Sequence, residues 1–416
     1  MSEWREKMLG KCISVSSGEG LPERKMKPGS YIVYEGNGFI GFHDEFLFEQ
    51  EQIIIGRVGA YCGNIHITKK KSWITDNALI VSFLQSDNDM HFWYYLLTEL
   101  NLRNSAFQSA QPVITGGIIS KIKINIPTYP IQKSISQILN TADAIIEKTQ
   151  SSIDKYKSIK QGMLHDLYTR GIDIRTGKLR PKYDDAPELY KESKLGWIPR
   201  DWEDGELIDF ADEKISHSFT GGPFGSDLQT KHYTKTGVRI IQLQNIGDGL
   251  FRDNYKIYTS ENKANQLINC NIYHGEIIIA KMADPIARAC IIPNTEKRYL
   301  MASDGIRLSI DKKKFNSRFV LETINHKRFR NIAEIKATGS TRARIGLTDL
   351  REIPVVYPDK KEQEQIGLRL DAIDNKIQAE QNYLHKLQQI KSGLMGDLLS
   401  GKKEVKLINK TEKINQ

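Results

Sequence analysis

The chain contains the same segment twice. At an offset of 231 positions, residues 132–167 and 363–398 share 12 identical residues in 36. Self-similarity over this length indicates a duplication, so the fold must consist of two related halves. The 416 residues exceed the size of one ordinary domain, which leaves room for a separate unit before each copy.

Each copy carries apolar residues at alternating steps of four and three. The first stripe runs from Ile135 to Tyr156 and the second from Ile366 to Leu387. This spacing predicts two long heptad helices that pack on each other, antiparallel. The segments INIPTYP at 124–130 and REIPVVYP at 351–358 each end a strand and begin a helix.

The regions before the two helices are rich in short β-branched runs such as QIIIGR and EIIIAK. The predicted fold class is therefore α+β: two mixed α/β domains and two long helices that form an antiparallel coiled coil, with a pseudo-two-fold internal repeat. The predicted boundaries are 1–128 for the first α/β domain, 129–170 for the first helix, 171–201 for a linker, 202–356 for the second α/β domain, 357–401 for the second helix and 402–416 for a disordered tail.

The composition of the chain predicts the kind of partner that it binds and the compartment in which it works. A formal net charge of +9 favours a polyanionic partner, although no region is strongly basic. The absence of a long apolar run predicts a cytoplasmic protein without membrane contact. The four cysteines form no C-x-x-C pair, which argues against a disulfide framework and against a bound metal.

Motifs for catalysis are missing from the sequence. A methyltransferase of adenine would show an N/D-P-P-Y/F motif, and a motor would show G-x-x-x-x-G-K-[ST]. Neither motif occurs, and the glycines of TGGPFGSD lack the lysine that a phosphate loop needs. We therefore predict that the chain is not an enzyme by itself and binds no cofactor.

Several motifs, in their order along the chain, resemble the specificity subunit of Type I restriction-modification systems. They are the helix onsets at Gln132 and at 362–365, the helix ends KQGMLHDL at 160–167 and KSGLMGDL at 391–398, GWIPRDW at 196–202 and GGPFGSDL at 221–228. The first domain departs from the pattern, because VYEGNGFIGFHDEFL at 33–47 takes the place of a GPFGS-type loop.

The resemblance implies a function and partners. Each α/β unit would be a target recognition domain for one half of a split site in double-stranded DNA, and the departure at 33–47 implies an asymmetric site. The helices would hold two methyltransferase subunits and the restriction or translocase subunits. S-adenosylmethionine, ATP and Mg²⁺ would be used on those other subunits for adenine-N6 methylation and ATP-dependent cleavage.

Reading DNA requires hydrogen-bonding side chains for base edges and cations for phosphates. Turn-rich segments of the first domain supply Tyr34, Asn37, Arg57, Tyr61, Lys69, Lys70, Lys71, Gln108 and Gln111. The second domain supplies Ser226, Lys231, Tyr233, Arg239, Gln242, Gln244, Asn245, Ser340, Thr341, Arg342 and Arg344.

The repeated helix ends supply candidate docking residues, which are Gly162, Asp166, Leu167, Gly393, Asp397 and Leu398. A glycine within a helix costs about 1 kcal/mol relative to alanine. Its presence in both copies predicts a close approach, either to the sister helix or to a partner subunit.

Two alternatives to the function of a Type I specificity subunit stay open: a coiled-coil scaffold that does not contact DNA, and the specificity subunit of a related methyltransferase-nuclease system with bipartite sites.

Overall fold

The structure is a computed structural model that describes residues 4–107, 111–282, 285–339 and 343–405. It divides into two compact units. The first unit comprises the chain up to residue 153 and from 379 onward, and the second comprises residues 154–378. Each unit therefore contains one α/β domain and one part of each long helix.

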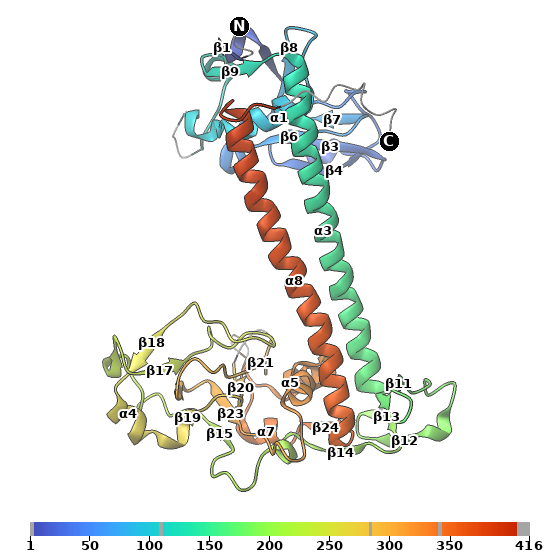
Figure 1. The fold of residues 1–416 in the computed structure, drawn as a ribbon, viewed down its shortest axis with the longest axis vertical. Coiled ribbons are helices and arrows are strands. Elements are labelled where there is room, and N and C mark those ends of the chain that lie inside the picture. Colours follow the sequence, from blue (N-terminus) through green and yellow to red (C-terminus); the bar gives the residue numbers. More distant parts are fainter. Residues whose placement is uncertain (1–3, 108–110, 283–284, 340–342, 406–416) are drawn as a thin grey trace. The chain divides into compact units, whose positions relative to one another are not determined.

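The first unit is built on two small sheets (Figure 1). The antiparallel sheet has the order β2 (Ile13–Ser17), β8 (Ala78–Phe83), β5 (Ile53–Gly56), β6 (Ile65–Ile67). The mixed sheet has the order β4 (Gly38–His43), β3 (Tyr31–Glu35), β7 (Ser72–Ile74), and β3 runs parallel to β7. Strand β5 is buried along its whole length, which explains why three successive isoleucines occupy it.

The second unit repeats this plan. Its antiparallel sheet has the order β15 (Phe219–Gly221), β23 (Gly305–Leu308), β20 (Ile277–Ala280), β21 (Ala289–Ile291). Its mixed sheet has the order β16 (Tyr233–Thr234), β18 (Ile257–Thr259), β17 (Val238–Ile241), β22 (Tyr299–Met301), β19 (Asn271–Ile272). Strands β17 and β22 are parallel, as β3 and β7 are. The similarity predicted between the two α/β regions is thus a shared strand order.

One helix and one two-stranded pair also recur in each unit. Helix α1 (Met90–Glu99) in the first unit corresponds to α5 (Ser317–Asn325) in the second. The antiparallel pair of β1 (Trp4–Met8) with β9 (Lys123–Pro127) corresponds to β14 (Glu203–Glu206) with β24 (Pro354–Tyr357). The remaining helices are α2 (Gly116–Ile119), α4 (Glu261–Gln266), α6 (Lys327–Lys336) and α7 (Leu347–Arg351).

The two long helices, α3 (Tyr129–Thr169) and α8 (Lys360–Leu399), are antiparallel, which confirms the prediction. In the first unit, Lys391 Nζ lies 2.5 Å from Asp143 Oδ1. In the second unit, Lys160 Nζ lies 2.7 Å from Asp374 Oδ1. The offset of 231 converts one ion pair into the other, so the helices obey the symmetry of the duplication. No helix in the described ranges has the length and apolarity needed to cross a membrane.

The ends of the helices belong to the domain cores. Ile135 and Leu139, near the start of α3, are buried in the core of the first unit together with Leu398 at the end of α8. In the second unit, Leu167 at the end of α3 joins Ile366 near the start of α8 in one core. Each long helix therefore begins in one hydrophobic core and ends in the other.

A glutamine at the start of each long helix fastens it to its domain. Gln132 Oε1 accepts from the Asp89 N–H at 3.1 Å, and Gln132 Nε2 donates to the Pro127 carbonyl at 3.0 Å. Gln363 repeats both bonds, with the Asn316 N–H and the Pro358 carbonyl, at 2.9 Å each. Asp89 and Asn316 are the N-caps of α1 and α5. In each unit, the side-chain amide of the glutamine therefore connects the start of a long helix to a helix N-cap and to the end of a strand.

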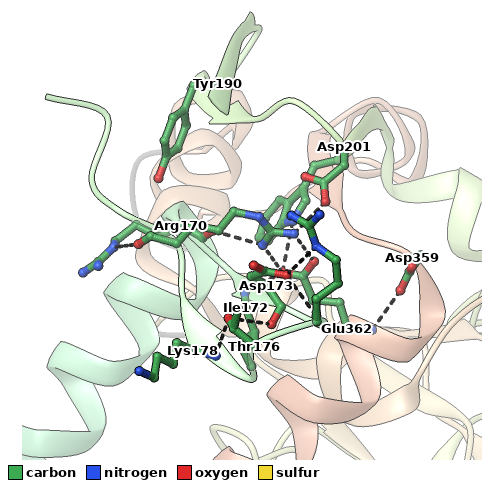
Figure 2. A network of polar contacts seen from close by, with 12 residues as sticks. Arg170, Ile172, Asp173, Thr176, Lys178, Tyr190, Asp201, Asp359 and Glu362 are labelled. Carbon is green, nitrogen blue, oxygen red and sulfur yellow. Dashed lines mark hydrogen bonds and ion pairs between the residues drawn. The ribbon is translucent and has the colours of Figure 1, made fainter. Parts of the chain in front are cut away.

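The linker, residues 171–201, is held by a buried charge cluster in the second unit (Figure 2). The Glu362 carboxylate, which is 2% exposed, accepts two hydrogen bonds from Arg180 at 2.7 and 2.8 Å. It also accepts from the Ile172 N–H at 2.7 Å and from Trp202 Nε1 at 3.2 Å. Arg180 donates further to Asp201 at 2.6 Å.

This cluster orders the linker. Two hairpins form there: β10 (Ile172–Asp173) with β11 (Lys178–Leu179), and β12 (Tyr190–Ser193) with β13 (Gly196–Pro199). The chain enters the first hairpin at Gly171, whose φ is +63°. A Cβ at this position would lie 2.1 Å from Glu362 Oε1, so the close approach of the carboxylate requires glycine.

Replacing Glu362 by Gln is expected to lower the free energy of unfolding by about 3 kcal/mol, because the largely buried Arg180 loses one of its two carboxylates. Urea unfolding of the full chain, followed by circular dichroism, measures the effect. Glu364→Gln is the matched control, since Glu364 is exposed on the same helix. It should change stability by less than about 0.5 kcal/mol. Equal effects of the two substitutions would show that the cluster does not stabilise the fold.

Candidate nucleic-acid interface

Loops gather at one end of the antiparallel sheet in the first unit. Strand β2 ends at Ser17, β5 ends at Gly56 and β8 begins at Ala78, so these termini share one edge. Arg57 joins the loops there, because its Nη1 donates to Ser17 Oγ at 3.3 Å and to the Asp76 carbonyl at 3.4 Å. We call this region, residues 17–20, 35–37, 57–63, 75–77 and 111–113, the first loop cluster.

The second unit has the matching region at the same edge of its sheet. The second loop cluster comprises residues 221–228, 242–244, 281–282, 302–304, 338–339 and 343–344. It contains a hollow of about 240 Å³. The hollow is lined by Pro223, Phe224, Leu228, Tyr233, Gln242, Leu243, Gln244, Ala302, Ser303 and Asp304. The hollow combines amide and hydroxyl groups with apolar side chains. It therefore suits the edge of a base better than it suits a phosphate group.

Part of the predicted set in the first domain lies in the first loop cluster. Asn37, Tyr61 and Gln111 are exposed there, and Arg57 is half-buried. Three exposed lysines, Lys69, Lys70 and Lys71, precede β7. The first loop cluster lies at the other end of this strand, so the structure does not bring the lysines to the cluster. Gln108 lies outside the described residues.

Tyr34 is buried among the isoleucines of the first domain. Its hydroxyl accepts a hydrogen bond from the Lys69 N–H at 3.1 Å. The tyrosine therefore supports the fold, and its burial weighs against a direct contact with DNA.

In the second domain, Tyr233, Gln242 and Gln244 line the hollow, and Gln242 Nε2 donates to the Tyr233 hydroxyl at 3.0 Å. Ser226 is exposed in the loop beside it, and Lys231 is exposed on the short helix Thr230–His232 that leads to Tyr233. Arg344 is half-exposed and donates to Asp304 at 2.8 Å. Ser340, Thr341 and Arg342 lie outside the described residues.

Two predicted contacts of the second domain are buried instead. Arg239 is 2% exposed and is paired with Asp253, whose pKa the Arg239 guanidinium holds below its ordinary value through their hydrogen bond. It also donates to the Tyr255 carbonyl at 3.2 Å and lies over the Phe251 ring. Asn245 donates to the carbonyls of Arg252 and Tyr255. These two side chains hold the loop after β17, and because both are buried neither exposes a hydrogen-bonding group to DNA.

Sequence reasoning missed side chains that the fold places beside the predicted ones. Phe224 is 82% exposed at the rim of the hollow, where an aromatic ring can contact a thymine methyl or stack on a base. Ser303 and Asp304 line the same hollow. Aligning the two halves by strand order rather than by residue identity would have found the Ser303 loop, because it follows β22 as Asp76 follows β7.

The candidate docking residues separate into three kinds. Leu167 and Leu398 are buried in the domain cores, so the prediction that they dock a partner is wrong: they anchor the helix ends inside this chain. Asp166 pairs with Arg170 at 3.2 Å and Asp397 with Lys403 at 3.4 Å. Gly162 and Gly393 are exposed, and a Cβ built on either meets no atom within 4 Å. The predicted approach of the sister helix is therefore wrong, and the partner alternative stays a prediction.

A family model described as "Type I restriction modification DNA specificity domain" matches residues 1–155 and 230–389. The MjaVIII specificity subunit of a type I restriction enzyme from Methanocaldococcus jannaschii is 22% identical over 369 residues, 88% of this chain and 82% of that protein. The EcoprrI specificity subunit from Escherichia coli is 31% identical over 148 residues, 34% of this chain and 37% of that one.

Solved structures show the same fold. The S subunit of a type I restriction-modification system from M. genitalium superposes with a TM-score of 0.59 at 16% identity, over 97% of both chains. A chain from a study of assembly and conformational transition of the type I system superposes with a TM-score of 0.55 at 13% identity, over 96% of this chain and 98% of that one.

The burial of Arg239 leads to a stability prediction. Arg239→Met should lower the free energy of unfolding by about 3 kcal/mol, because it removes charge-assisted hydrogen bonds that hold a loop. Arg344→Met is the control, since that side chain is half-exposed and its ion pair contributes about 1 kcal/mol or less. Urea unfolding compares the two variants, and a larger effect at Arg344 would contradict the structural role of Arg239.

Proposed function

The chain belongs to the type I restriction modification DNA specificity family, and from that premise we propose that it reads a split, asymmetric site in double-stranded DNA. Each α/β domain would read one part of the site through its loop cluster. The observation that carries this proposal is the pairing of a repeated scaffold with two loop clusters whose side chains differ.

The difference between the clusters supports an asymmetric site. The strand orders place Glu35 of the first domain where Gln242 stands in the second, and Asn77 where Asp304 stands. A carboxylate accepts hydrogen bonds only, whereas an amide both donates and accepts. Domains with unlike groups at matched positions select different base edges.

We propose further that the chain acts in the cytoplasm as the non-catalytic member of a larger complex. Two methyltransferase subunits would use S-adenosylmethionine to methylate adenines on the bound DNA, and restriction or translocase subunits would use ATP and Mg²⁺. The absence of the motifs for methyl transfer and for nucleotide binding from the sequence supports this division of labour.

The coiled coil would set the spacing between the two parts of the site. The two Lys–Asp ion pairs place residues 150–156 of α3 opposite residues 378–384 of α8. Deleting both segments removes one heptad from each helix, which shortens the pair by about 10 Å, or about three base pairs. The variant complex should recognise the same two parts with a spacer about three base pairs shorter.

Sequencing the methylated adenines in cells that carry the variant measures the spacer. Deleting residues 150–156 alone is the control: it should abolish methylation, because the ion pairs can no longer form together. An unchanged spacer in the double deletion would contradict the proposed role of the helices. Complexes that bind DNA without sequence preference would instead indicate a scaffold.

We propose that the open helix surface at Gly162 and the equivalent surface at Gly393 each receive a methyltransferase subunit. Leucine at both positions should leave the unfolding midpoint of the chain unchanged or raised, since leucine favours the helix and meets no neighbour, while weakening co-purification with the partner. Ala144→Leu, at another exposed position of α3, is the control. Full assembly of the double leucine variant would remove these glycines from the proposed contact surface.

A further inference from the structure

One cation occupies the same place in both domains. Arg57 directly follows strand β5, and Lys281 directly follows strand β20, which has the same position in its sheet. Lys281 was not among the residues that sequence reasoning selected. The two positions correspond by topology, because β5 pairs with β6 and β8 as β20 pairs with β21 and β23.

The main chain around this cation is held in the same way in both domains. The Arg57 N–H donates to the Asn77 carbonyl at 3.0 Å, and the Arg57 carbonyl accepts from the Ile114 N–H at 3.0 Å. In the second domain, the Lys281 N–H donates to the Asp304 carbonyl at 2.7 Å, and the Lys281 carbonyl accepts from the Ile345 N–H at 3.0 Å. Two backbone bonds therefore fix where each side chain leaves the chain.

Both cations stand at the base of a candidate contact loop. Ile114 follows a β-bridge between Phe107 and Val113, and Ile345 follows a β-bridge between Thr338 and Arg344. The candidate contact Gln111 lies between the residues of the first bridge, and the candidate contact Arg344 is one of the residues of the second bridge. A cation beside residues that contact DNA would lie close to the DNA backbone.

Neither cation is neutralised within the described residues. The hydrogen-bond partners of the Arg57 guanidinium are a hydroxyl and a carbonyl, and it forms no ion pair with a carboxylate among the described residues. Lys281 makes no ion pair in the part of the chain that the structure describes, and the nearby Asp304 carboxylate is bound by Arg344. Both side chains are half-buried, so the aliphatic part of each is held by its surroundings and the charged group lies at its end.

The matched neighbours of these cations differ between the domains, whereas the positive charge stays. Asp76 corresponds to Ser303, and Asn77 corresponds to Asp304. Groups that read bases are expected to differ when the two parts of a site differ. A group that contacts phosphate meets the same chemistry in any sequence, and only its charge must be retained.

We propose that Arg57 and Lys281 are matched contacts to backbone phosphates, one in each domain, which orient the loop clusters on DNA without reading its sequence. This inference rests on the proposed function and deepens it by assigning a role to the same loop clusters. Among the candidate DNA contacts, Arg57 is thereby assigned to a phosphate, and Lys281 enters the interface.

The test uses the complete complex with its methyltransferase subunits and two duplexes of equal length. One duplex contains the sequence methylated in the host, and the other contains the same bases shuffled. Affinity is measured over a range of salt concentrations. Lys281→Gln and Arg57→Gln should each weaken binding of both duplexes by the same factor and reduce the slope of log K against log salt by about one. In the double variant, the slope of log K against log salt should fall by about two.

Charge-retaining variants and a distant lysine serve as controls. Lys281→Arg and Arg57→Lys should keep the slope of the unaltered complex, because a phosphate accepts either cation. Lys313→Gln removes the same charge from an exposed position beyond the opposite end of β23 and should leave the slope unchanged. Thermal unfolding midpoints confirm that each variant is folded, and Lys281→Met replaces Lys281→Gln if the glutamine variant unfolds.

Failure of the proposed function and failure of the phosphate assignment give different results. If the unaltered complex binds both duplexes equally, the proposed function is wrong, and the orienting role is wrong with it. If sequence preference is present and neither substitution changes the slope, the phosphate assignment alone is overturned. A loss restricted to the methylated sequence overturns it as well, because that pattern marks a base contact.

Discussion

The two Lys–Asp ion pairs between the long helices are the constraint on which the arrangement of each unit depends. Lys160 meets Asp374 and Lys391 meets Asp143, and these four residues are two pairs of equivalents under the duplication. An antiparallel pair of helices satisfies both bridges at once. A parallel pair in register would place lysine beside lysine and aspartate beside aspartate, which is unfavourable. The charged residues that the duplication copied therefore favour the antiparallel direction.

This direction determines what each domain is built from. The start of one helix and the end of the other enter each hydrophobic core, which contains Leu139 and Leu398 in the first unit and Leu167 and Ile366 in the second. The glutamines Gln132 and Gln363 then fix each helix start to a helix cap and a strand end. With the scaffold held by buried and repeated contacts, the loops at the sheet edge can differ without changing the fold.

The sequence predicted the features that depend on periodicity and on the repeat. Heptad spacing predicted both helices and their antiparallel pairing, and the short β-branched runs before each helix predicted two mixed α/β domains. Features that depend on distant partners were not predictable. Arg239 looks like an exposed polar strand residue until Asp253 and Phe251 are placed against it, and Glu362 meets Arg180 from 182 positions away. Leu167 and Leu398 carried a docking signal, but a repeated apolar residue does not reveal whether its partner lies within the chain.

The central claim is that each domain reads its own part of the DNA site. The most direct measurement is the map of methylated adenines in cells that express this chain with its methyltransferase subunits, before and after residues 1–128 are exchanged for the first domain of another family member. The account predicts a split sequence in which the exchange alters one part and leaves the other part and the spacer unchanged. A contiguous site, or a change in both parts, would contradict it.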